Sequence, residues 1–553
     1  MQPSPVCNSS KRVWPEGLIC LIMMLATFGC CLQLSHAENS RTTPPLRSDN
    51  LKPHFETVAG REVFYVDGWP FTILAVEIPW EDLVYGRYRE TLHAYDKLYP
   101  AAKAIGMNTL IVPVKWSMIE PEKDQYDFSY VDHVKEMAER NHLKLVLGWF
   151  AHYASNDGNL YFNLTGEFFA PSYIVNDEKT YPRAVDAEGV SYHNAVSYEY
   201  DAITEREAKA FRSFMEHIKN IDARSCTILM VQVENEIAVF GGERSDHKLW
   251  RDHSPRSNEL YVAKGFKSDI KYSAWRLSSN WLRRVTDAGA QGYQLPFYLN
   301  FVAGRVGDDV LGGSPGEDVA TYLDNCPSIK FIGVDLYLPA DTSVEEMRSA
   351  LSRYKVGRNL PALAETNSDR TFVAPRLAFL AVGEFGAPIV APWALTISYL
   401  NDYQPMVLPD GTLANGALAL QDAYTSLSKA LPQISYYASS GNLKVFMARV
   451  PGEKFSETAQ IADLQLKVSG AENGQLIVLR PTQNEVIIIG YRCDVSLWNN
   501  VFKWPALQQV HVERGAWSGN EWRPEGEPLY EVDQVERRLG VQVNEPQVVR
   551  VRW

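Results

Sequence analysis

Strand-like and helix-like stretches alternate along most of this chain, and this alternation restricts its possible folds more than any other feature. Eight short apolar runs predict buried strands, and a helical stretch separates each from the next. The predicted strands are 71–78, 109–114, 143–149, 227–233, 296–301, 331–337, 361–365 and 388–393. Eight such units predict an α/β fold of the (β/α)8 TIM-barrel type with long loops.

An open, doubly wound sheet is the alternative arrangement for alternating strands and helices. Such a fold often carries a G-x-G-x-x-G turn after an early strand, and no such turn follows the early strands here. The closed barrel is therefore favoured.

The first 37 residues predict a signal peptide. Lys11 and Arg12 precede the apolar run 17–34, which ends before the small-x-small pattern 35–37. A membrane anchor and lipidation at Cys30 are the alternatives, but Gly29 and the cysteines make the run a mediocre span. We expect an exported protein, periplasmic or extracellular, with a polar linker over 38–52.

The pattern changes after about residue 426. Short strand-like runs separated by turn residues follow one another to the C-terminus, at 443–450, 460–468, 475–479, 485–491, 508–513 and 548–553. This predicts a catalytic barrel over 53–425 and an all-β domain of sandwich type over 426–553.

Composition argues against several classes of partner. The formal net charge is -13 and no basic stripe compensates for it, so a nucleic-acid partner is not expected. Beyond residue 37 the cysteines are Cys226, Cys326 and Cys493, which lack metal-binding spacing. We predict three buried free thiols, and no metal or cofactor.

The stretch 227–240, TILMVQVENEIAVF, carries the strongest functional signal. A strand buried on both faces runs directly into Glu234, Asn235 and Glu236. Packing alone does not favour two carboxylates and an amide at that position. In barrels this end of a strand is where catalytic groups lie, although solvated carboxylates at a strand exit are the alternative explanation.

A second carboxylate, Glu365, ends the predicted strand 361–365. Glu236 follows strand four and Glu365 ends strand seven, so both should face the same rim of the barrel. Glycoside hydrolysis uses such a pair: one carboxyl group protonates the leaving oxygen, and the other attacks the anomeric carbon or activates water.

Several motifs resemble those of bacterial family-35 glycoside hydrolases, β-galactosidase-like members of the four-seven retaining clan with an extra C-terminal β domain. The acid/base strand is matched by 231–236, VQVENE, and the strand-two signature by 108–128. Residues 170–173 and 181–183 resemble a loop segment of the same family group. Residues 513–517 and Trp522 resemble that group's C-terminal domain. The resemblance covers nearly the whole chain after the signal segment.

The resemblance implies roles for four residues. Glu236 would be the general acid/base and Glu365 the nucleophile, with carboxyl groups about 5–5.5 Å apart and a covalent glycosyl-enzyme intermediate. Asn235 would donate a hydrogen bond to the sugar 2-hydroxyl. Tyr337 would hydrogen-bond the nucleophile and keep it ionised.

Four residues at other strand ends are candidates for binding substrate. Glu77 could bind sugar hydroxyls or pair with an arginine of a loop. Trp116, Trp149 and Trp393 follow strands two, three and eight and could form a platform for a sugar ring, or pack in the barrel. Glu234 should make hydrogen bonds behind the site or bind a substrate hydroxyl.

The resemblance implies an exo-acting β-galactosidase that removes terminal galactose from plant-type oligosaccharides such as xyloglucan side chains. Thr366-Asn367-Ser368 and Pro392-Trp393 depart from the family pattern in the sugar pocket. A β-glucoside, β-glucosaminide or α-L-arabinoside therefore remains an alternative substrate. A non-catalytic carbohydrate-binding barrel is the alternative of another class, and the oligomeric state is not predicted.

Overall fold

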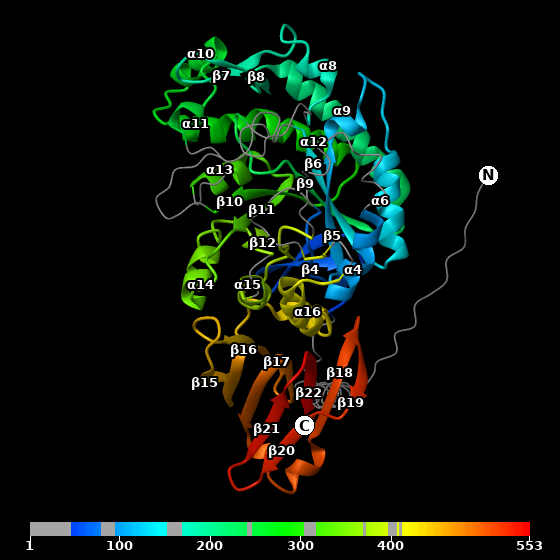
Figure 1. Ribbon diagram of the computed structural model, residues 1–553. Helices are drawn as coiled ribbons and strands as arrows, with labels where there is room; N and C mark the ends of the chain where they lie inside the picture. The colour runs from blue at the N-terminus through cyan, green and yellow to red at the C-terminus, as the bar shows by residue number, and fades with distance from the viewer. Residues whose placement is uncertain are drawn as a thin grey trace, which may run out of the picture. The chain divides into compact units, whose positions relative to one another are not determined.

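The computed structural model describes residues 46–78, 95–151, 169–240, 246–303, 317–368, 372–395, 406–408 and 412–553 (Figure 1). The predicted signal peptide 1–37 and residues 38–45 of the predicted linker lie outside these ranges. Among the helices described, none combines the length and the apolar character needed to cross a membrane.

Eight parallel strands form a barrel, which confirms the predicted fold. Their order around the sheet is β4-β13-β12-β11-β10-β9-β6-β5. Strands β4 and β5 close the ring, because the Ile111 N–H donates to Val76 O at 3.0 Å and the Ile78 N–H to Ile111 O at 2.9 Å. The strands are β4 (Ile73–Leu74), β5 (Thr109–Lys115), β6 (Lys144–Phe150), β9 (Ile228–Val233), β10 (Phe297–Val302), β11 (Ile329–Leu336), β12 (Ala362–Thr366) and β13 (Ile389–Val390).

Helices cover the outside of the barrel (Figure 1). The longest helix, α9, precedes β9 and packs along α12. The barrel helices are α4 (Leu98–Ile105), α6 (Ser129–Arg140), α9 (Asp201–Asp222), α11 (Asp269–Arg276), α12 (Arg283–Gly292), α13 (Glu317–Asn325), α14 (Val344–Ser352), α15 (Val373–Leu380) and α16 (Asn415–Ser428).

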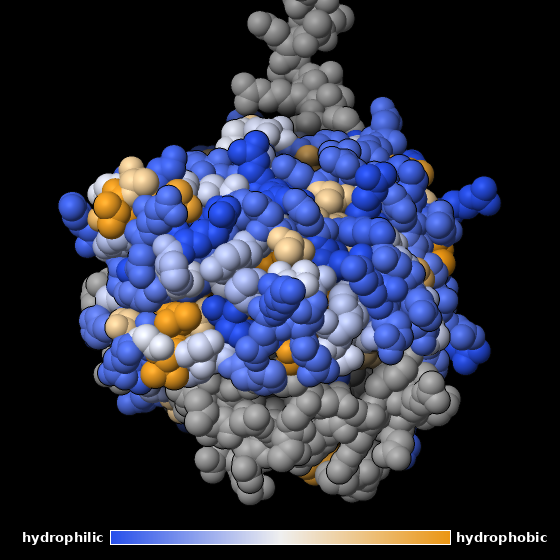
Figure 2. Space-filling model, turned by 90° about the horizontal axis from the view of Figure 1, so that it is seen from above, coloured by the Kyte–Doolittle hydropathy of each residue, from blue (hydrophilic) through white to orange (hydrophobic). Residues whose placement is uncertain are grey.

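Shorter elements occupy the loops around this core. These are α5 (Trp116–Ile119), α8 (Ser172–Val175), α10 (Pro255–Ala263), α17 (Leu431–Tyr437) and the hairpin of β7 (Arg183–Val185) and β8 (Ser191–Val196). Figure 2 shows that the face seen from above is mostly hydrophilic, with scattered hydrophobic residues, as expected of a surface in contact with water.

The barrel strands are buried on both faces. Along β5, Leu110, Val112 and Val114 belong to the large cluster between strands and helices, whereas Ile111 belongs to the cluster inside the barrel. This explains the continuous apolar runs in the sequence, since neither face of a strand in a barrel contacts water. It also fixes which residues at a strand end point inward.

An N-terminal hairpin covers the barrel end where the strands begin. β1 (His54–Val58), β2 (Arg61–Val66) and β3 (Trp69–Pro70) form an antiparallel sheet. The turn at Asp67 and Gly68 has positive φ at both residues, as is typical of an Asp-Gly hairpin turn. Phe64 joins the cluster inside the barrel, so the hairpin seals that end.

The C-terminal part is a nine-stranded antiparallel sheet that bends on itself. The predicted strand 460–468 spans the end of β15, a turn at 462–463 and the start of β16. The predicted strand 475–479 lies further along the same 19-residue β16, whose pairing with β17 is interrupted between Gly470 and Gln475. The strands are β14 (Leu443–Met447), β15 (Phe455–Ile461), β16 (Leu464–Thr482), β17 (Glu485–Trp498), β18 (His511–Ser518), β19 (Glu521–Gly526), β20 (Leu529–Asp533), β21 (Arg538–Val543) and β22 (Gln547–Arg552). Its two halves enclose a separate core, which gives the expected sandwich.

This sheet shares a second apolar surface with the barrel. Leu476 and Val478 of β16 enter the sheet's own core, whereas Ile477 and Leu479 enter the large cluster around the barrel. Gly383 permits the contact, since a Cβ there would lie 2.6 Å from Val445 Cγ2. The predicted boundary at residue 426 falls inside α16, and the first strand of the sheet begins only at Leu443.

The three cysteines outside the N-terminal segment are free and buried, which confirms the prediction. Burial raises the pKa of the Cys226 thiol, and those of Cys326 and Cys493 even further. All three thiols therefore stay protonated and unreactive near neutral pH.

Candidate active site

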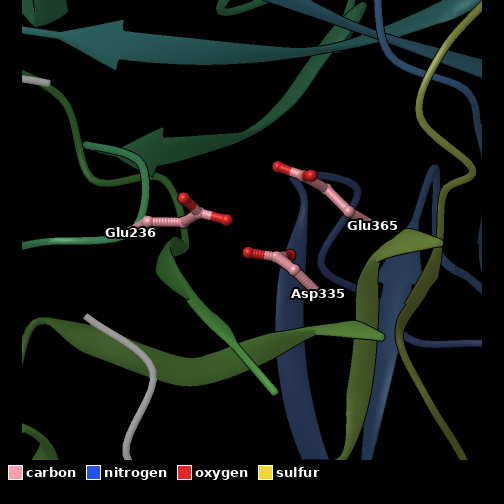
Figure 3. Close-up of side chains that lie close together, drawn as sticks. All are labelled: Glu236, Asp335 and Glu365. Atoms are coloured by element: carbon pink, nitrogen blue, oxygen red, sulfur yellow. The ribbon is translucent and has the colours of Figure 1, made fainter. Parts of the chain in front are cut away.

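Three carboxyl side chains meet at the rim where the barrel strands end. One oxygen from each of Glu236, Asp335 and Glu365 lies within 4.8 Å of the others (Figure 3). Glu236 follows β9, Asp335 lies near the end of β11 and Glu365 near the end of β12. The structure thus brings together the predicted pair and adds Asp335, which was not among the predicted site residues.

Glu365 is the best buried of the two predicted catalytic carboxylates. Its Oε2 accepts a hydrogen bond from the Tyr337 hydroxyl at 2.5 Å, and its Oε1 accepts one from Asn300 Nδ2 at 3.1 Å. Burial raises the pKa of Glu365 to about 7, and the two hydrogen bonds act against that rise. The predicted hydrogen bond between Tyr337 and Glu365 is thus present, and 37% of Tyr337 is exposed.

An amide network holds the rim in place. Asn300 Nδ2 donates to Asn235 Oδ1 at 2.5 Å and to Asp335 Oδ2 at 2.8 Å. Its Oδ1 accepts from Gln232 Nε2 at 3.1 Å and from the Glu236 N–H at 3.3 Å. Asn235 Oδ1 also accepts from Gln232 Nε2 at 3.0 Å, so its amide nitrogen is the group that can donate to a sugar hydroxyl.

Asn300 and Asp335 belong to the candidate site but were not among the residues predicted from the sequence. Both are polar residues in strands whose other buried side chains are apolar, 297–302 and 329–336. Isolated polar side chains in a strand buried on both faces carry a desolvation cost, and that was the available signal.

The turn after β9 has unusual backbone geometry. Glu234 has a φ of 69° and Glu236 a φ of 45°, values that non-glycine residues seldom adopt. Glu234 Oε1 accepts the Ala151 N–H at 2.6 Å, beside the end of β6. Glu234 therefore makes a hydrogen bond behind the site, whereas Glu236 lies with the other two carboxyl groups.

Two of the four candidate binding residues, Glu77 and Trp393, continue the inward-facing positions of their strands. Ile389 and Ala391 belong to the cluster inside the barrel, and Trp393 follows with the same parity and is 8% exposed. Glu77 is 1% exposed, and its charge helps to raise the pKa of Asp335. Both residues therefore lie on the side of the barrel that holds the carboxyl groups.

The prediction that Trp116 and Trp149 form part of a sugar platform is wrong. Both side chains are fully buried in the cluster between strands and helices. The Trp116 indole N–H donates to Glu120 at 2.9 Å, and that of Trp149 donates to Glu207 at 3.3 Å. They follow the outward parity of their strands, so they pack against helices and cannot contact a sugar at the rim.

The three carboxyl groups are also the described side chains close enough to share a cation. Both oxygens of Glu365 and one oxygen of Asp335 already accept hydrogen bonds from Asn300 and Tyr337. We therefore treat the group as a hydrogen-bonded carboxyl cluster.

The sequence matches no protein-family model and no curated protein. Among solved structures, it is similar to a β-galactosidase from Marinomonas ef1 (12% identity, 64% of this chain, 59% of that chain, TM-score 0.40). It is also similar to an exo-β-1,4-mannosidase from Opitutaceae bacterium strain TAV5 (15% identity, 65% of this chain, 60% of that chain, TM-score 0.41). A third similar structure is an endo-glycoceramidase II from Rhodococcus sp. in complex with ganglioside GM3 (14% identity, 91% of this chain, 99% of that chain, TM-score 0.43).

The chain spans only about 59–60% of the first two structures and 99% of the third. All three are named as enzymes that cleave glycosides. At identities of 12–15% and TM-scores of 0.40–0.43, we draw neither a family nor a substrate from them.

Proposed function

We propose that this protein is a retaining glycoside hydrolase in which Glu365 is the nucleophile and Glu236 the general acid/base. The observation that carries the proposal is the short separation of their carboxyl oxygens, at most 4.8 Å. Retaining enzymes hold the two groups about 5–5.5 Å apart, whereas inverting enzymes leave about 6.5–9.5 Å for a water molecule.

The contacts of each carboxyl group fit its proposed role. Glu365 receives hydrogen bonds from Tyr337 and Asn300, which favour the ionised form that attacks the anomeric carbon. Glu236 is only partly buried, so it can reach the leaving-group oxygen and later accept a proton from water. Asn235 would donate to the 2-hydroxyl, and Trp393 would contact the sugar ring.

Terminal β-galactose on plant-type oligosaccharides, such as xyloglucan side chains, is the substrate we propose first, with action outside the cytoplasm after export. The support for this choice is the sequence resemblance to family-35 enzymes. The departures at 366–368 and 392–393 are the reason to test β-glucosides, β-glucosaminides and α-L-arabinosides beside it.

The test is hydrolysis of a panel of aryl glycosides of these sugars, with the configuration of the first product followed by NMR. We expect one sugar to be cleaved with retention of configuration. Inversion would exclude Glu365 as a nucleophile, and binding without turnover on every sugar would favour the non-catalytic alternative.

A further inference from the structure

Asp335 is the member of the carboxyl cluster that a two-carboxylate mechanism leaves without a role. It is 1% exposed and lies opposite Glu365 in the pairing of β11 with β12. Figure 3 shows its carboxyl group beside those of Glu236 and Glu365, the three groups forming a triangle. A buried acid this close to both proposed catalytic groups will affect their charge, whatever else it does.

The surroundings of Asp335 contain more negative charge than they can stabilise. Carboxyl groups face it from three other elements: Glu365 on β12, Glu236 after β9 and Glu77 after β4. The remaining titratable neighbours are phenols, namely Tyr298 on β10, Tyr337 after β11 and Tyr354 after α14. In the part of the chain that the structure describes, no arginine, lysine or histidine forms an ion pair with Asp335.

The hydrogen bonds available to the cluster are also too few for two ionised carboxylates. The Asn300 amide has two N–H groups but faces three acceptors, on Asn235, Asp335 and Glu365. Glu365 receives a second hydrogen bond from Tyr337. Asp335 Oδ1, by contrast, is buried and has no partner among the described residues.

We propose that Asp335 is a neutral carboxylic acid that carries the proton of the Asp335–Glu365 pair and thereby keeps Glu365 ionised. It is a positioning residue, and the inference rests on the proposed function. The proton belongs on Oδ1, the oxygen that no donor contacts, because Oδ2 accepts from Asn300. Two carboxyl groups this close and this buried do not both ionise, so neutralising one preserves the charge of the other.

The pKa directions agree with this assignment. Burial, and then the charges of Glu365, Glu236 and Glu77, raise the pKa of Asp335 far above its usual range, with one opposing hydrogen bond from Asn300. Two hydrogen bonds oppose the rise for Glu365. The proton therefore stays on Asp335 when Glu365 loses its own.

The experiment compares Asp335→Asn, a neutral isostere that keeps an oxygen to accept from Asn300 Nδ2, with Asp335→Leu, which removes that acceptor. A 2-deoxy-2-fluoro glycoside with a dinitrophenolate leaving group labels the nucleophile without needing acid catalysis, so its inactivation rate reports on Glu365 alone. We expect the rate for Asp335→Asn to stay within about threefold of wild type and that for Asp335→Leu to fall by about 100-fold. Asp422→Asn, in the exposed pair with Arg492, is the control variant and should match wild type.

The pH profile of the labelling rate is the second measurement. The labelling rate should fall at low pH, where Glu365 takes up a proton, and Asp335→Asn should leave the position of this fall unchanged, because a neutral Asp335 has no charge for the substitution to remove. The proposal is overturned if Asp335→Asn loses as much rate as Asp335→Leu at pH 7, because an ionised Asp335 would then be required. It is also overturned if Asp335→Leu, folded by circular dichroism, labels like wild type.

An infrared difference spectrum separates failure of this inference from failure of the proposed function. Wild type minus Asp335→Asn at pH 7 should contain the carbonyl band of a protonated carboxylic acid. If no sugar labels the wild type, the proposed function fails, and the band still decides the state of Asp335. A carboxylate band in its place would overturn the inference even in an active glycosidase.

Discussion

The inside of the barrel and the layer between its strands and helices each hold a buried carboxyl group whose pKa is raised to about 7. Inside the barrel it is Glu365 on β12, and in the outer layer it is Glu207 on α9. Burial is the main cause of the rise in both. A raised pKa therefore does not by itself distinguish a catalytic group from a structural one.

The partners of the two groups make the distinction. Glu207 accepts hydrogen bonds from Trp281 at 2.7 Å, Tyr198 at 3.1 Å and Trp149 at 3.3 Å, all buried aromatic donors of the helix-packing core. Glu365 instead lies beside two further acids and beside Tyr337, which is partly exposed. Glu365 is thus distinguished by neighbouring acids and by access to solvent. Glu207 is distinguished by hydrogen-bond donors that occupy its carboxyl oxygens.

The substitution Glu365→Gln should have the largest effect on catalysis. An amide cannot attack the anomeric carbon, so kcat/KM should fall by about 10⁴-fold or more, measured with the best aryl glycoside. The thermal midpoint should not fall, because the variant removes a buried charge from a crowded cluster. Activity within tenfold of wild type would exclude the two-carboxylate mechanism.

Trp393→Ala should lower kcat/KM by about 10- to 100-fold through the loss of apolar contact with the sugar ring. Trp149 is the matched residue on the outer face. Trp149→Phe should leave kcat/KM for the folded protein within about threefold and lower its thermal midpoint. Equal kinetic effects of the two substitutions would contradict the assignment of inner and outer registers.

Glu207→Gln should act on stability and spare catalysis. The amide keeps the shape of the carboxyl group but replaces one acceptor with a donor, which leaves aromatic donors without partners. We expect a loss of about 1–3 kcal/mol in the free energy of unfolding, measured by urea denaturation near pH 5. A catalytic efficiency reduced about 100-fold without loss of stability would give Glu207 a role in the reaction.

The smallest effect is on the pH dependence of stability. The pKa of Glu207 is raised in the folded state, so the folded protein binds more protons than the unfolded chain between about pH 4.5 and 7. Stability that this group contributes at low pH is lost as the pH rises through that window. Relative to wild type, Glu207→Gln should show a shallower decline in stability over the same range, measured by urea denaturation at several pH values.

The barrel and the predicted carboxyl pair could be foreseen because both depend on local patterns. Continuous apolar runs identify the strands, and Glu236 and Glu365 end two of them. The faces taken by Trp116 and Trp149 could not be foreseen, because a strand buried on both sides shows no alternation to orient it. The approach of Asp335 to Glu365 depends on the register of β11 with β12, which only the folded sheet defines.

The shared surface between β16 and the barrel has a consequence for how this chain can be altered. Ile477 and Leu479 face the barrel, and the buried Arg376 of α15 donates to the carbonyl groups of Ala448 and Arg449. A chain that ended before β14 would expose this apolar surface and leave the Arg376 guanidinium without two of its carbonyl acceptors. Such a chain should aggregate. We therefore expect a barrel moved into another protein to need its own sheet to remain soluble.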